Sequence, residues 1–373
     1  MEGGESALRI AMVLPSLDIG GEEFAVLRLA KSLAERNHRV HIVCTDHLGE
    51  LASEVSSVNG ISLAVAKTRG WRDVVFPSAL LAELDAFHPQ VVHSHTGSWF
   101  QCAACRSVRR SFVLVHTEHG MISRPEPLKL AILKRLARER TDSLSAVSES
   151  LRLELSRQLR IGSDSICTIP NGIDVAQFQA SAHRRSQARE QLAATADEIV
   201  VGCVARLHPL KGIDVLLDAW AALKTESRSR LVVIGDGQER EVLRERARRL
   251  NVPVNFMGSR SDVALLMSGL DVFVLPSRSE GLPLALLEAM ATGLPCVVTD
   301  VGEMSAVLGG GDYGLVVPPE RPAELAAAIG LLLANPTRRA SYAEGVRERV
   351  ESLYGHDRTV AHYVSTYRRL LQS

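Results

Sequence analysis

The chain has 373 residues, of which 46% are hydrophobic, and its 43 basic residues balance 43 acidic ones. This length is sufficient for two globular domains, and zero net charge excludes a general electrostatic attraction to nucleic acid. Residues 1–5 form neither a basic nor an apolar leader, and no apolar run reaches the roughly 20 residues that a membrane-spanning helix needs. We therefore expect a cytoplasmic protein.

Six cysteines are spread through predicted strands and helices, which is typical of buried thiols in a reducing compartment rather than of a disulfide framework. Cys102 and Cys105 form a Cys-x-x-Cys pair, but a zinc site requires two further ligands at matching spacing, and none follows. The pair is more simply interpreted as one face of a helix.

Short apolar and β-branched runs alternate with helical stretches, the pattern of parallel strands covered by helices on both faces. In the first half the runs are residues 9–14, 40–45, 61–66, 91–94, 112–116 and 143–147. In the second half they are residues 199–205, 231–234, 254–257, 271–275, 295–299 and 315–317. The pattern predicts an α/β protein of two doubly wound, Rossmann-like domains.

The break between the domains is expected after residues 169–174, which contain Pro170 and Gly172 and are followed by a polar, Arg-rich stretch at 181–190. We assign residues 1–175 to the first domain and 176–355 to the second. A last helix is predicted within residues 356–373 with no strand after it. Its periodicity leaves open whether it packs back on the first domain.

Ligands of open parallel sheets bind at the carboxyl ends of the strands, where helix N-termini present backbone N–H groups. Gly20 and Gly21 follow the first strand, and a helix is predicted to begin near residue 22. The two glycines let the backbone approach an anion, although a plain tight turn explains them equally well.

Three histidines follow or end the fourth and fifth strands. His119, with Gly120 after it, follows the fifth strand, where an imidazole can bind a sugar or move a proton. We interpret His93 and His95 as structural and expect them on opposite faces of their strand. No carboxylate or cysteine cluster accompanies the three residues, so a metal site is not indicated.

Two long cations, Arg206 and Lys211, follow the first strand of the second half, before a helix predicted over residues 213–223. A guanidinium can bind two oxygens of a diphosphate, and an ammonium acts as a point charge. The alternative is a pair of solvated surface cations.

Residues 276–290 carry the most informative pattern, with Glu280 in a loop and Glu288 in a helix that is otherwise apolar on all sides. The Glu288 carboxylate is expected to leave water, which is costly unless polar groups such as ribose hydroxyls meet it. Pro283 suits the first turn of this helix, whose free N–H groups can hold a phosphate. The alternative pairs Glu288 with a buried arginine and leaves Glu280 exposed.

Two further segments have weaker patterns. The run Gly235-Asp236-Gly237 matches a dinucleotide fingerprint only in part, because Arg240 occupies the third glycine position, and a dehydrogenase is therefore disfavoured. Residues 124–140 contain six basic and two acidic residues with leucines at helical spacing. This predicts a basic amphipathic helix that lies on an anionic membrane or, alternatively, an ordinary surface helix with its apolar face in the core.

Taken together, these residues resemble family 4 of the retaining glycosyltransferases, which have the GT-B fold. The resemblance covers nearly the whole chain, and its most specific element is the two-glutamate signature from Glu280 to Glu288 with residues 289–295 after it. The other matching pieces are Gly20-Gly21 with Glu23, His119-Gly120, and residues 145–148, 170–174, 206–212 and 235–237.

The resemblance implies transfer of a sugar from a nucleotide diphosphate donor, held in a cleft between the domains, with retained anomeric configuration and with neither an essential metal nor another cofactor. It implies that Arg206 and Lys211 hold the diphosphate and stabilise the leaving charge. It further implies that Glu288 binds ribose, Glu280 binds the donor sugar, and His119 lies near the reacting carbon. The implied site residues are, for catalysis, His119, Arg206, Lys211 and Glu280 and, for donor binding, Gly20, Gly21, Gly281, Leu282, Pro283, Leu284 and Glu288.

The implied partners are a nucleotide-sugar donor, with a UDP-sugar favoured, and a glycan or lipid-linked acceptor of cell-surface polysaccharide or glycolipid synthesis. Through residues 124–140 the inner face of a membrane is a further expected partner. Two alternatives stay open, a sugar-nucleotide epimerase or hydrolase and a non-catalytic nucleotide-sugar-binding scaffold. The chain departs from the family at residues 301–306, because the family often carries there a second Gly-Gly with a Glu four or five residues later, and that Glu is missing here. We expect this departure to affect the packing of that loop more than catalysis.

Overall fold

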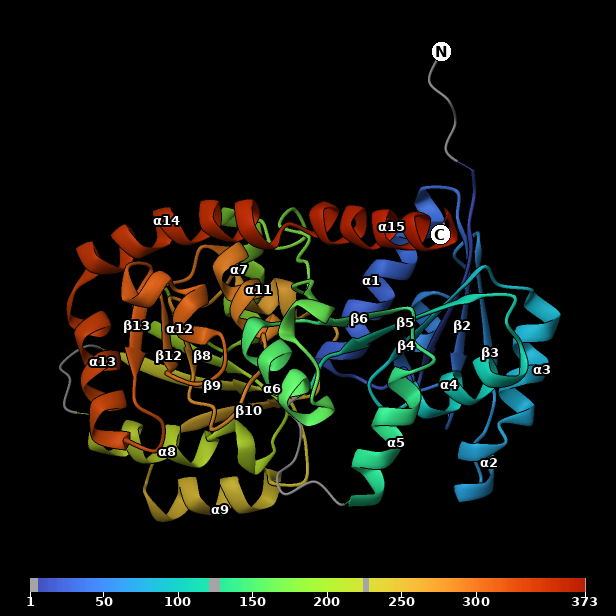
Figure 1. Ribbon diagram of the computed structural model, residues 1–373. Coiled ribbons are helices and arrows are strands. Elements are labelled where there is room, and N and C mark those ends of the chain that lie inside the picture. Colours follow the sequence, from blue (N-terminus) through green and yellow to red (C-terminus); the bar gives the residue numbers. More distant parts are fainter. Residues whose placement is uncertain (1–5, 121–127, 224–227, 373) are drawn as a thin grey trace. The chain divides into compact units, whose positions relative to one another are not determined.

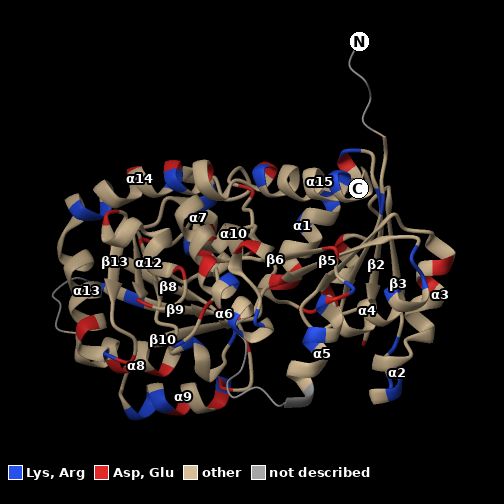
Figure 2. Cartoon of the chain, viewed as in Figure 1, with Lys and Arg blue, Asp and Glu red and all other residues tan. Residues whose placement is uncertain are grey.

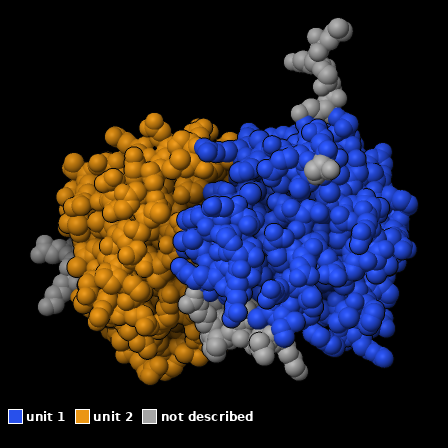
Figure 3. Space-filling model, viewed as in Figure 1, with its two compact units in different colours: residues 1–171, 357–373 blue, residues 172–356 orange. Residues whose placement is uncertain are grey.

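The apolar runs of the sequence form two parallel sheets in the computed structural model, which describes residues 6–120, 128–223 and 228–372 (Figure 1). Two units contain these sheets and are coloured separately in Figure 3. Unit 1 comprises residues 1–171 and 357–373, and unit 2 comprises residues 172–356. The predicted boundaries were residues 175 and 355, and the last helix, whose packing the sequence left open, belongs to unit 1.

The sheet of unit 1 has seven strands in the order β3-β2-β1-β4-β5-β6-β7, and neighbouring strands pair in parallel. Six of them were predicted, and the seventh is a three-residue edge strand that is too short to show a period. The strands are β1 (Arg9–Leu14), β2 (Arg39–Cys44), β3 (Ile61–Val65), β4 (Val91–His95), β5 (Val113–Glu118), β6 (Ser143–Ala146) and β7 (Ile166–Thr168).

The helices of unit 1 connect these strands and cover the sheet. They are α1 (Gly21–Glu35), α2 (Trp71–Val75), α3 (Ser78–Phe87), α4 (Trp99–Val108), α5 (Leu128–Arg138), α6 (Glu149–Leu159) and α15 (His356–Gln372), with the 3-10 turns η1 (Glu50–Glu54) and η2 (Ser163–Ser165). The terminal helix α15 buries Val360, Tyr363 and Tyr367 in the same apolar cluster as Ile10 and Met12 of β1. Aromatic side chains therefore attach this helix to the centre of the sheet.

The sheet of unit 2 has six parallel strands in the order β10-β9-β8-β11-β12-β13, all of them predicted. Every residue of β11 and β12 is buried, which explains why they appear in the sequence as short continuous apolar runs. The strands are β8 (Ile199–Val204), β9 (Ser229–Ile234), β10 (Val254–Gly258), β11 (Val272–Leu275), β12 (Cys296–Thr299) and β13 (Gly314–Val317).

The helices of unit 2 are α7 (Ala182–Gln191), α8 (Ile213–Ala222), α9 (Arg240–Arg249), α10 (Val263–Met267), α11 (Leu284–Thr292), α12 (Met304–Val307), α13 (Pro322–Ala334) and α14 (Pro336–Tyr354), with the 3-10 turns η3 (Pro209–Lys211) and η4 (Gly309–Gly311). An apolar cluster joins α8, α9 and α13 to one face of the sheet through residues such as Leu216, Leu243 and Ile329. Within the described part of the chain, none of the helices is both long and apolar enough to span a bilayer.

Candidate active site

Two predicted catalytic residues of unit 2, Lys211 and Glu280, form an ion pair. Lys211 ends the turn η3 after β8, and Glu280 lies in the loop after β11. Because β8 and β11 are paired neighbours, both loops leave the same edge of the sheet. The Lys211 ammonium donates to Oε1 of Glu280 at an Nζ–Oε1 distance of 2.6 Å.

Glu280 is buried, with 7% of its surface exposed. The hydroxyl of Ser277, itself fully buried, donates a second hydrogen bond to the same Oε1 atom at 2.7 Å. Thr299 in turn donates from its hydroxyl to the carbonyl of Ser277 at 2.6 Å. The alternative with an exposed Glu280 is therefore wrong, and the buried carboxylate is compensated by one cation and one hydroxyl.

Two glycines allow the loop that carries Glu280 to contact its neighbours closely. A Cβ on Gly212 (φ +64°) would lie 2.1 Å from the carbonyl oxygen of Pro276, and a Cβ on Gly302 (φ +55°) would lie 2.1 Å from that of Glu280. The N–H of Glu303 also donates to the carbonyl of Gly281 at 3.1 Å. Gly302, which lies in the stretch where the sequence departs from the family pattern, thus holds the loop that carries Glu280.

Arg278 ties the same loop to α8. Its guanidinium donates to both carboxylate oxygens of Asp214 at 2.8 and 2.7 Å and to Glu320 at 2.7 Å. Burial opposes ionisation of Asp214, but the bonds and charge of Arg278 outweigh it, and the pKa of Asp214 is lowered. The N–H of Arg278 donates to the carbonyl of Leu210 at 2.8 Å, which fixes the loop beside η3. Sequence reasoning did not find this residue, because a surface arginine has no local signature.

Arg206, the other predicted diphosphate ligand, is exposed, and among the described residues no carboxylate pairs with it. Its loop is held by the glycine run after β9. A Cβ on Gly235 would lie 2.0 Å from the carbonyl oxygen of Ala205, and one on Gly237 would lie 2.4 Å from that of Leu207. Close backbone packing therefore explains the Gly-Asp-Gly run without a dinucleotide.

The helix α11 begins at Leu284, one residue after the proline that was expected in its first turn. Pro283 is the N-cap residue, and no side chain of the described residues caps this helix end. Its carbonyl accepts from the N–H groups of Leu286 at 3.1 Å and Leu287 at 3.4 Å. The N–H groups of Leu284 and Ala285 come before these bonds and lie at the positive end of the helix, a favourable place for an anion.

The predicted donor-binding residues Gly281, Leu282, Pro283 and Leu284 are buried, whereas Glu288 is partly exposed. Glu288 is therefore not fully buried, although it was expected to leave water. Glu288 and Ala285 form a narrow, partly exposed stripe on α11, while the other sides of the helix are buried.

Gly20 and Gly21, predicted in unit 1, form the N-terminus of α1. Gly20 is the N-cap with extended backbone, and Gly21 is the first helical residue. A Cβ on Gly20 would lie 2.2 Å from Oε2 of Glu23, so that carboxylate lies over the N-cap. This arrangement resembles the reciprocal cap in which a glutamate three positions into a helix bonds back to its start.

His119 lies directly after β5, with its ring bonded to that of His95. The His95 Nδ1 to His119 Nε2 distance is 3.0 Å, and the backbone N–H of His119 donates to the hydroxyl of Thr96 at 2.9 Å. Burial lowers the pKa of His119 to about 4, with the nearby Glu118 opposing this effect. The imidazole is therefore neutral at physiological pH, and its Nδ1 atom is buried with no partner among the described residues.

The prediction that His93 and His95 lie on opposite faces of β4 was wrong, because residues two apart in a strand share a face. Their ring centroids are 4.2 Å apart. His93 is structural as expected, since it bonds the hydroxyls of Tyr367 and Thr117 at 2.7 Å each. His95, in contrast, orients His119.

The predicted basic segment 124–140 is described only from residue 128 onward, as α5, and residues 124–127 lie outside the described residues. Lys134 is buried and donates to Oε1 of Gln158 at 2.8 Å. Ile132 and Leu136 are 53% and 48% exposed. The helix thus buries part of one face in unit 1 and leaves apolar side chains on another.

Neither cysteines nor acidic residues form a metal site in the described part of the chain, where no group of three or more His, Cys, Asp or Glu side chains can hold an ion. All six cysteines are free thiols, including Cys102 and Cys105. Burial raises the pKa of Cys105 to about 12, so this thiol is protonated and packs as an apolar group.

Comparison with known proteins identifies relatives over both units. Residues 19–177 match the model described as Glycosyltransferase Family 4, and residues 198–335 match the model described as Glycosyl transferases group 1. The chain is 29% identical over 404 residues to the D-inositol 3-phosphate glycosyltransferase of Kineococcus radiotolerans, covering 95% of this chain and 92% of that protein. It is 32% identical over 225 residues to the putative glycosyltransferase EpsF of Bacillus subtilis, a match that covers 60% of this chain and 54% of EpsF.

The fold also matches that of a solved structure. The crystal structure of Anabaena HepE in complex with UDP and glucose matches with a TM-score of 0.85 and 21% identity, over 96% of this chain and 99% of HepE. The two family models show that the chain belongs to glycosyltransferase family 4, and the structural match together with the two parallel sheets shows the two Rossmann-like domains of the GT-B fold.

Proposed function

We propose that this glycosyltransferase moves a sugar from a UDP-sugar to a glycan or lipid-linked acceptor of cell-surface polysaccharide or glycolipid synthesis, with retention at the anomeric carbon and without a metal. The observation that carries this proposal is the ion pair of Lys211 with the buried Glu280, which the β8–β11 pairing brings to one edge of unit 2. HepE, which has the same fold, was crystallised with UDP and glucose, and this supports UDP as the nucleotide.

The diphosphate is assigned to positive groups of unit 2. Lys211 is 24% exposed on its side chain, so its ammonium can bind a phosphate oxygen while it stays beside Glu280. The exposed Arg206 guanidinium can bind two oxygens, and the uncapped N–H groups at the start of α11 can bind a third. These donors stabilise the charge that develops on the leaving diphosphate, which is the role a divalent cation has in other transferases.

The sugars of the donor are assigned to the two glutamates. Both hydrogen bonds to Glu280 use Oε1, which leaves Oε2 to accept from a hydroxyl of the transferred sugar. In this proposal Glu288, one turn into α11 and partly exposed, accepts from ribose hydroxyls. The neutral imidazole of His119 serves as a hydrogen-bonding group for the sugar near the reacting carbon rather than as a cation.

Retention follows in this proposal if the diphosphate leaves and the acceptor attacks on one face of the sugar, through an oxocarbenium-like state. The acceptor loses its hydroxyl proton, and the departing phosphate oxygen is the acceptor of that proton. Analysis of the product by NMR tests this step, since an inverted anomeric configuration would contradict it.

A thermal-shift panel tests the donor. A ligand that binds only the folded state raises the melting temperature, so UDP and UDP-sugars are expected to stabilise the protein more than GDP, ADP and their sugars. Equal shifts for all nucleotides, or none, would count against the UDP assignment.

Incubation with the donor alone separates the alternative functions. An epimerase or hydrolase converts the donor quantitatively without an acceptor, whereas a non-catalytic scaffold releases no nucleotide over multiple turnovers.

The membrane contact of residues 124–140 is the second part of the proposal. The exposed Ile132 and Leu136 and the basic Arg135 lie on the described part of this segment. We infer peripheral binding to the inner, anionic face of a membrane, where lipid-linked acceptors are found. Sedimentation with anionic vesicles at low salt is the test, and a protein that stays in the supernatant would exclude it.

A further inference from the structure

Three apolar side chains on and directly after α2 are exposed without an evident structural purpose. Trp71 is 61% exposed, Phe76 is 75% exposed and Val75 is 39% exposed. In contrast, Trp99 and Phe112 of the same unit are 3% and 4% exposed. Large aromatic side chains are normally buried in the hydrophobic core, so a group of exposed ones indicates a binding surface. We call Trp71, Val75 and Phe76 the aromatic tip.

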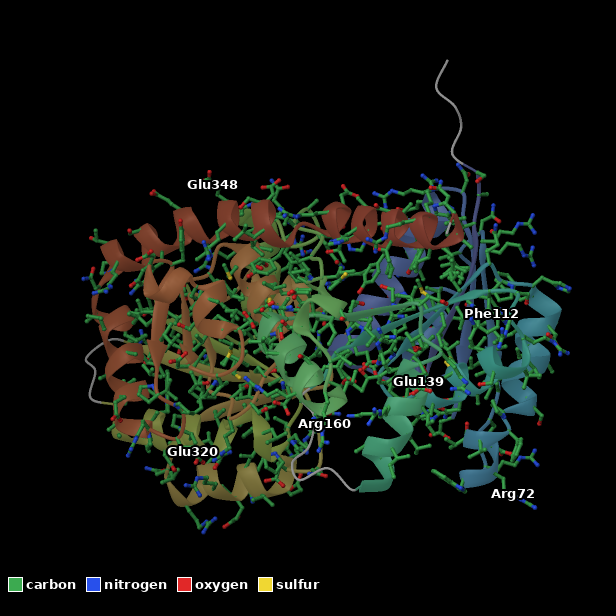
Figure 4. The ribbon with its side chains drawn as sticks, in the orientation of Figure 1. Arg72, Phe112, Glu139, Arg160, Glu320 and Glu348 are labelled. Carbon is green, nitrogen blue, oxygen red and sulfur yellow. The ribbon has the colours of Figure 1, made fainter. Side chains whose placement is uncertain are left out.

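Basic residues surround the aromatic tip. Lys67, Arg69 and Arg72 are exposed, and within the described ranges no carboxylate pairs with any of them. The nearby Asp73 carboxylate accepts from the backbone N–H of Arg69 at 2.8 Å. Figure 2 shows basic residues on α2, and Figure 4 shows the labelled Arg72 pointing away from the rest of the unit. The tip thus combines exposed apolar area with a net positive charge in the adjacent residues.

Helices α2 and α5 both pack against α4, so the aromatic tip and the basic segment belong to one region of unit 1. Figure 1 shows the two helices extending in the same direction. The chain enters α2 from the carboxyl end of β3 and enters α5 after the carboxyl end of β5. Because the strands are parallel, the chain leaves β3 and β5 at the same edge of the sheet, the edge that also carries His119.

We propose that the aromatic tip inserts into the headgroup layer of an anionic membrane and is a second membrane-binding element beside α5. This inference deepens the proposed membrane contact and rests on it. Tryptophan is favoured at the boundary between headgroups and acyl chains, and lysine and arginine bind anionic lipid phosphates beside it. An anionic lipid surface complements the tip in both respects, because it presents negative charge for the basic residues and, beneath it, an apolar layer for the aromatic side chains. Bound in this way, the edge with His119 lies next to lipid-linked acceptors.

Tryptophan fluorescence tests insertion directly, with vesicles of equimolar phosphatidylglycerol and phosphatidylcholine. The other tryptophans are the buried Trp99 and Trp220, which is partly buried in unit 2. Emission is expected to shift to shorter wavelength on binding and to be quenched by brominated lipids. In Trp71→Phe the shift and the quenching should disappear while the protein still sediments with the vesicles. Unshifted, unquenched emission from fully bound wild type would overturn the proposal.

Partitioning measurements separate the two elements. The double variant Trp71→Ala/Phe76→Ala is expected to bind vesicles about tenfold more weakly, including at high salt, where charge attraction is screened. Val242→Ala on α9 of unit 2, where Val242 is 58% exposed, is the matched control and should bind like wild type. Lys67→Gln/Arg72→Gln should lose affinity mainly at low salt. Unchanged partitioning of the tip variant would also overturn the proposal.

These measurements need neither donor nor acceptor, so their failure is distinct from failure of the transferase assignment. The melting temperature of each variant with and without UDP reports on the donor site in the same preparations. The tip variant should melt like wild type, since α2 contributes no buried residue to the described core.

Discussion

The ammonium of Lys211 lies 2.6 Å from Oε1 of Glu280, a carboxylate that is only 7% exposed. The pair joins the loop after β8 to the loop after β11, so one contact fixes two loops of the proposed donor site. A buried ion pair contributes little net stability, but removal of one partner leaves an uncompensated charge. We therefore expect loss of this contact to affect both the stability and the proposed catalytic activity of the protein.

Substitution of Lys211 is expected to abolish transfer. Lys211→Met retains most of the volume but removes the charge, so the diphosphate loses a stabilising cation and kcat/KM should fall by about 10³-fold. The variant should remain folded but lose about 3 kcal/mol in free energy of unfolding, because Glu280 stays buried without its cation. Steady-state kinetics and urea unfolding measure the two effects. Lys31→Met is the control, since it breaks an exposed pair with Glu54 at 3.0 Å. A kcat/KM of Lys211→Met close to that of the wild type would contradict the proposed role.

Arg206 is expected to affect binding without affecting stability. It is exposed and has no carboxylate partner in the described part of the chain, so Arg206→Gln should change the free energy of unfolding by less than about 0.5 kcal/mol. Loss of charge-assisted hydrogen bonds to the diphosphate should weaken UDP binding by about 10- to 100-fold, as measured by calorimetry. Arg244→Gln on α9, which breaks an exposed pair with Glu241, should leave UDP affinity unchanged. A wild-type affinity in Arg206→Gln would remove this residue from the site.

Gly302 is expected to be as important as the charged residues, although it carries no side chain. In Gly302→Ala the new Cβ would meet the carbonyl oxygen of Glu280 at 2.1 Å, so the loop that carries Glu280 must move. We expect a loss of about 2 kcal/mol in stability, from backbone strain at positive φ and from overpacking, and a fall in kcat of at least about tenfold.

Gly310→Ala is the matched control for that variant. Gly310 also has a positive φ of 72°, but a Cβ there would meet nothing within 4 Å. Gly310→Ala should therefore lose only about 1 kcal/mol in free energy of unfolding, from the strain of alanine at positive φ, and should keep the wild-type kcat. Equal effects of the two substitutions on kcat would show that contact with Glu280 does not matter.

The pKa of His119 is expected to lie below the ordinary histidine value of 6.5, and the pKa of His47 above it. Burial lowers the pKa of His119 to about 4, whereas hydrogen bonds to Asp18 and Asp46 raise the pKa of His47. By NMR, the His119 ring should thus remain neutral at pH 5, while the His47 ring is protonated. A His119 ring that titrates near pH 6.5 would contradict its burial beside His95.

A consequence for stability follows from the lowered pKa of His119. The contribution of the neutral ring to folding is fully present above about pH 6.5 and is lost as the pH falls toward 4, because the unfolded chain takes up a proton that the folded protein excludes. Burial lowers the pKa values of His93 and His95 as well, so they act in the same direction. Urea unfolding between pH 7 and pH 4.5 should show this decline, and a flat profile would count against it.

The sequence was sufficient to predict the strands and the pair of charged loops. All twelve predicted strands are present, because a strand buried on both faces needs a continuous run of apolar residues, and that requirement is local. Lys211 and Glu280 were recognised because each lies within a few residues of a predicted strand end, and the parallel order of strands places such ends together. Only the short edge strand β7 was missed.

Tertiary structure alone decided the contacts between loops that are distant in the chain. The support of Glu280 by Ser277 and Gly302, the bonding of Arg278 to Asp214 and the orientation of His119 by His95 all depend on how strands pair. Likewise, the exposure of Trp71 and Phe76 is visible only once the core has been formed from other residues. The physical reason is that local patterns specify elements and their ends, whereas burial and hydrogen bonding depend on which elements become neighbours.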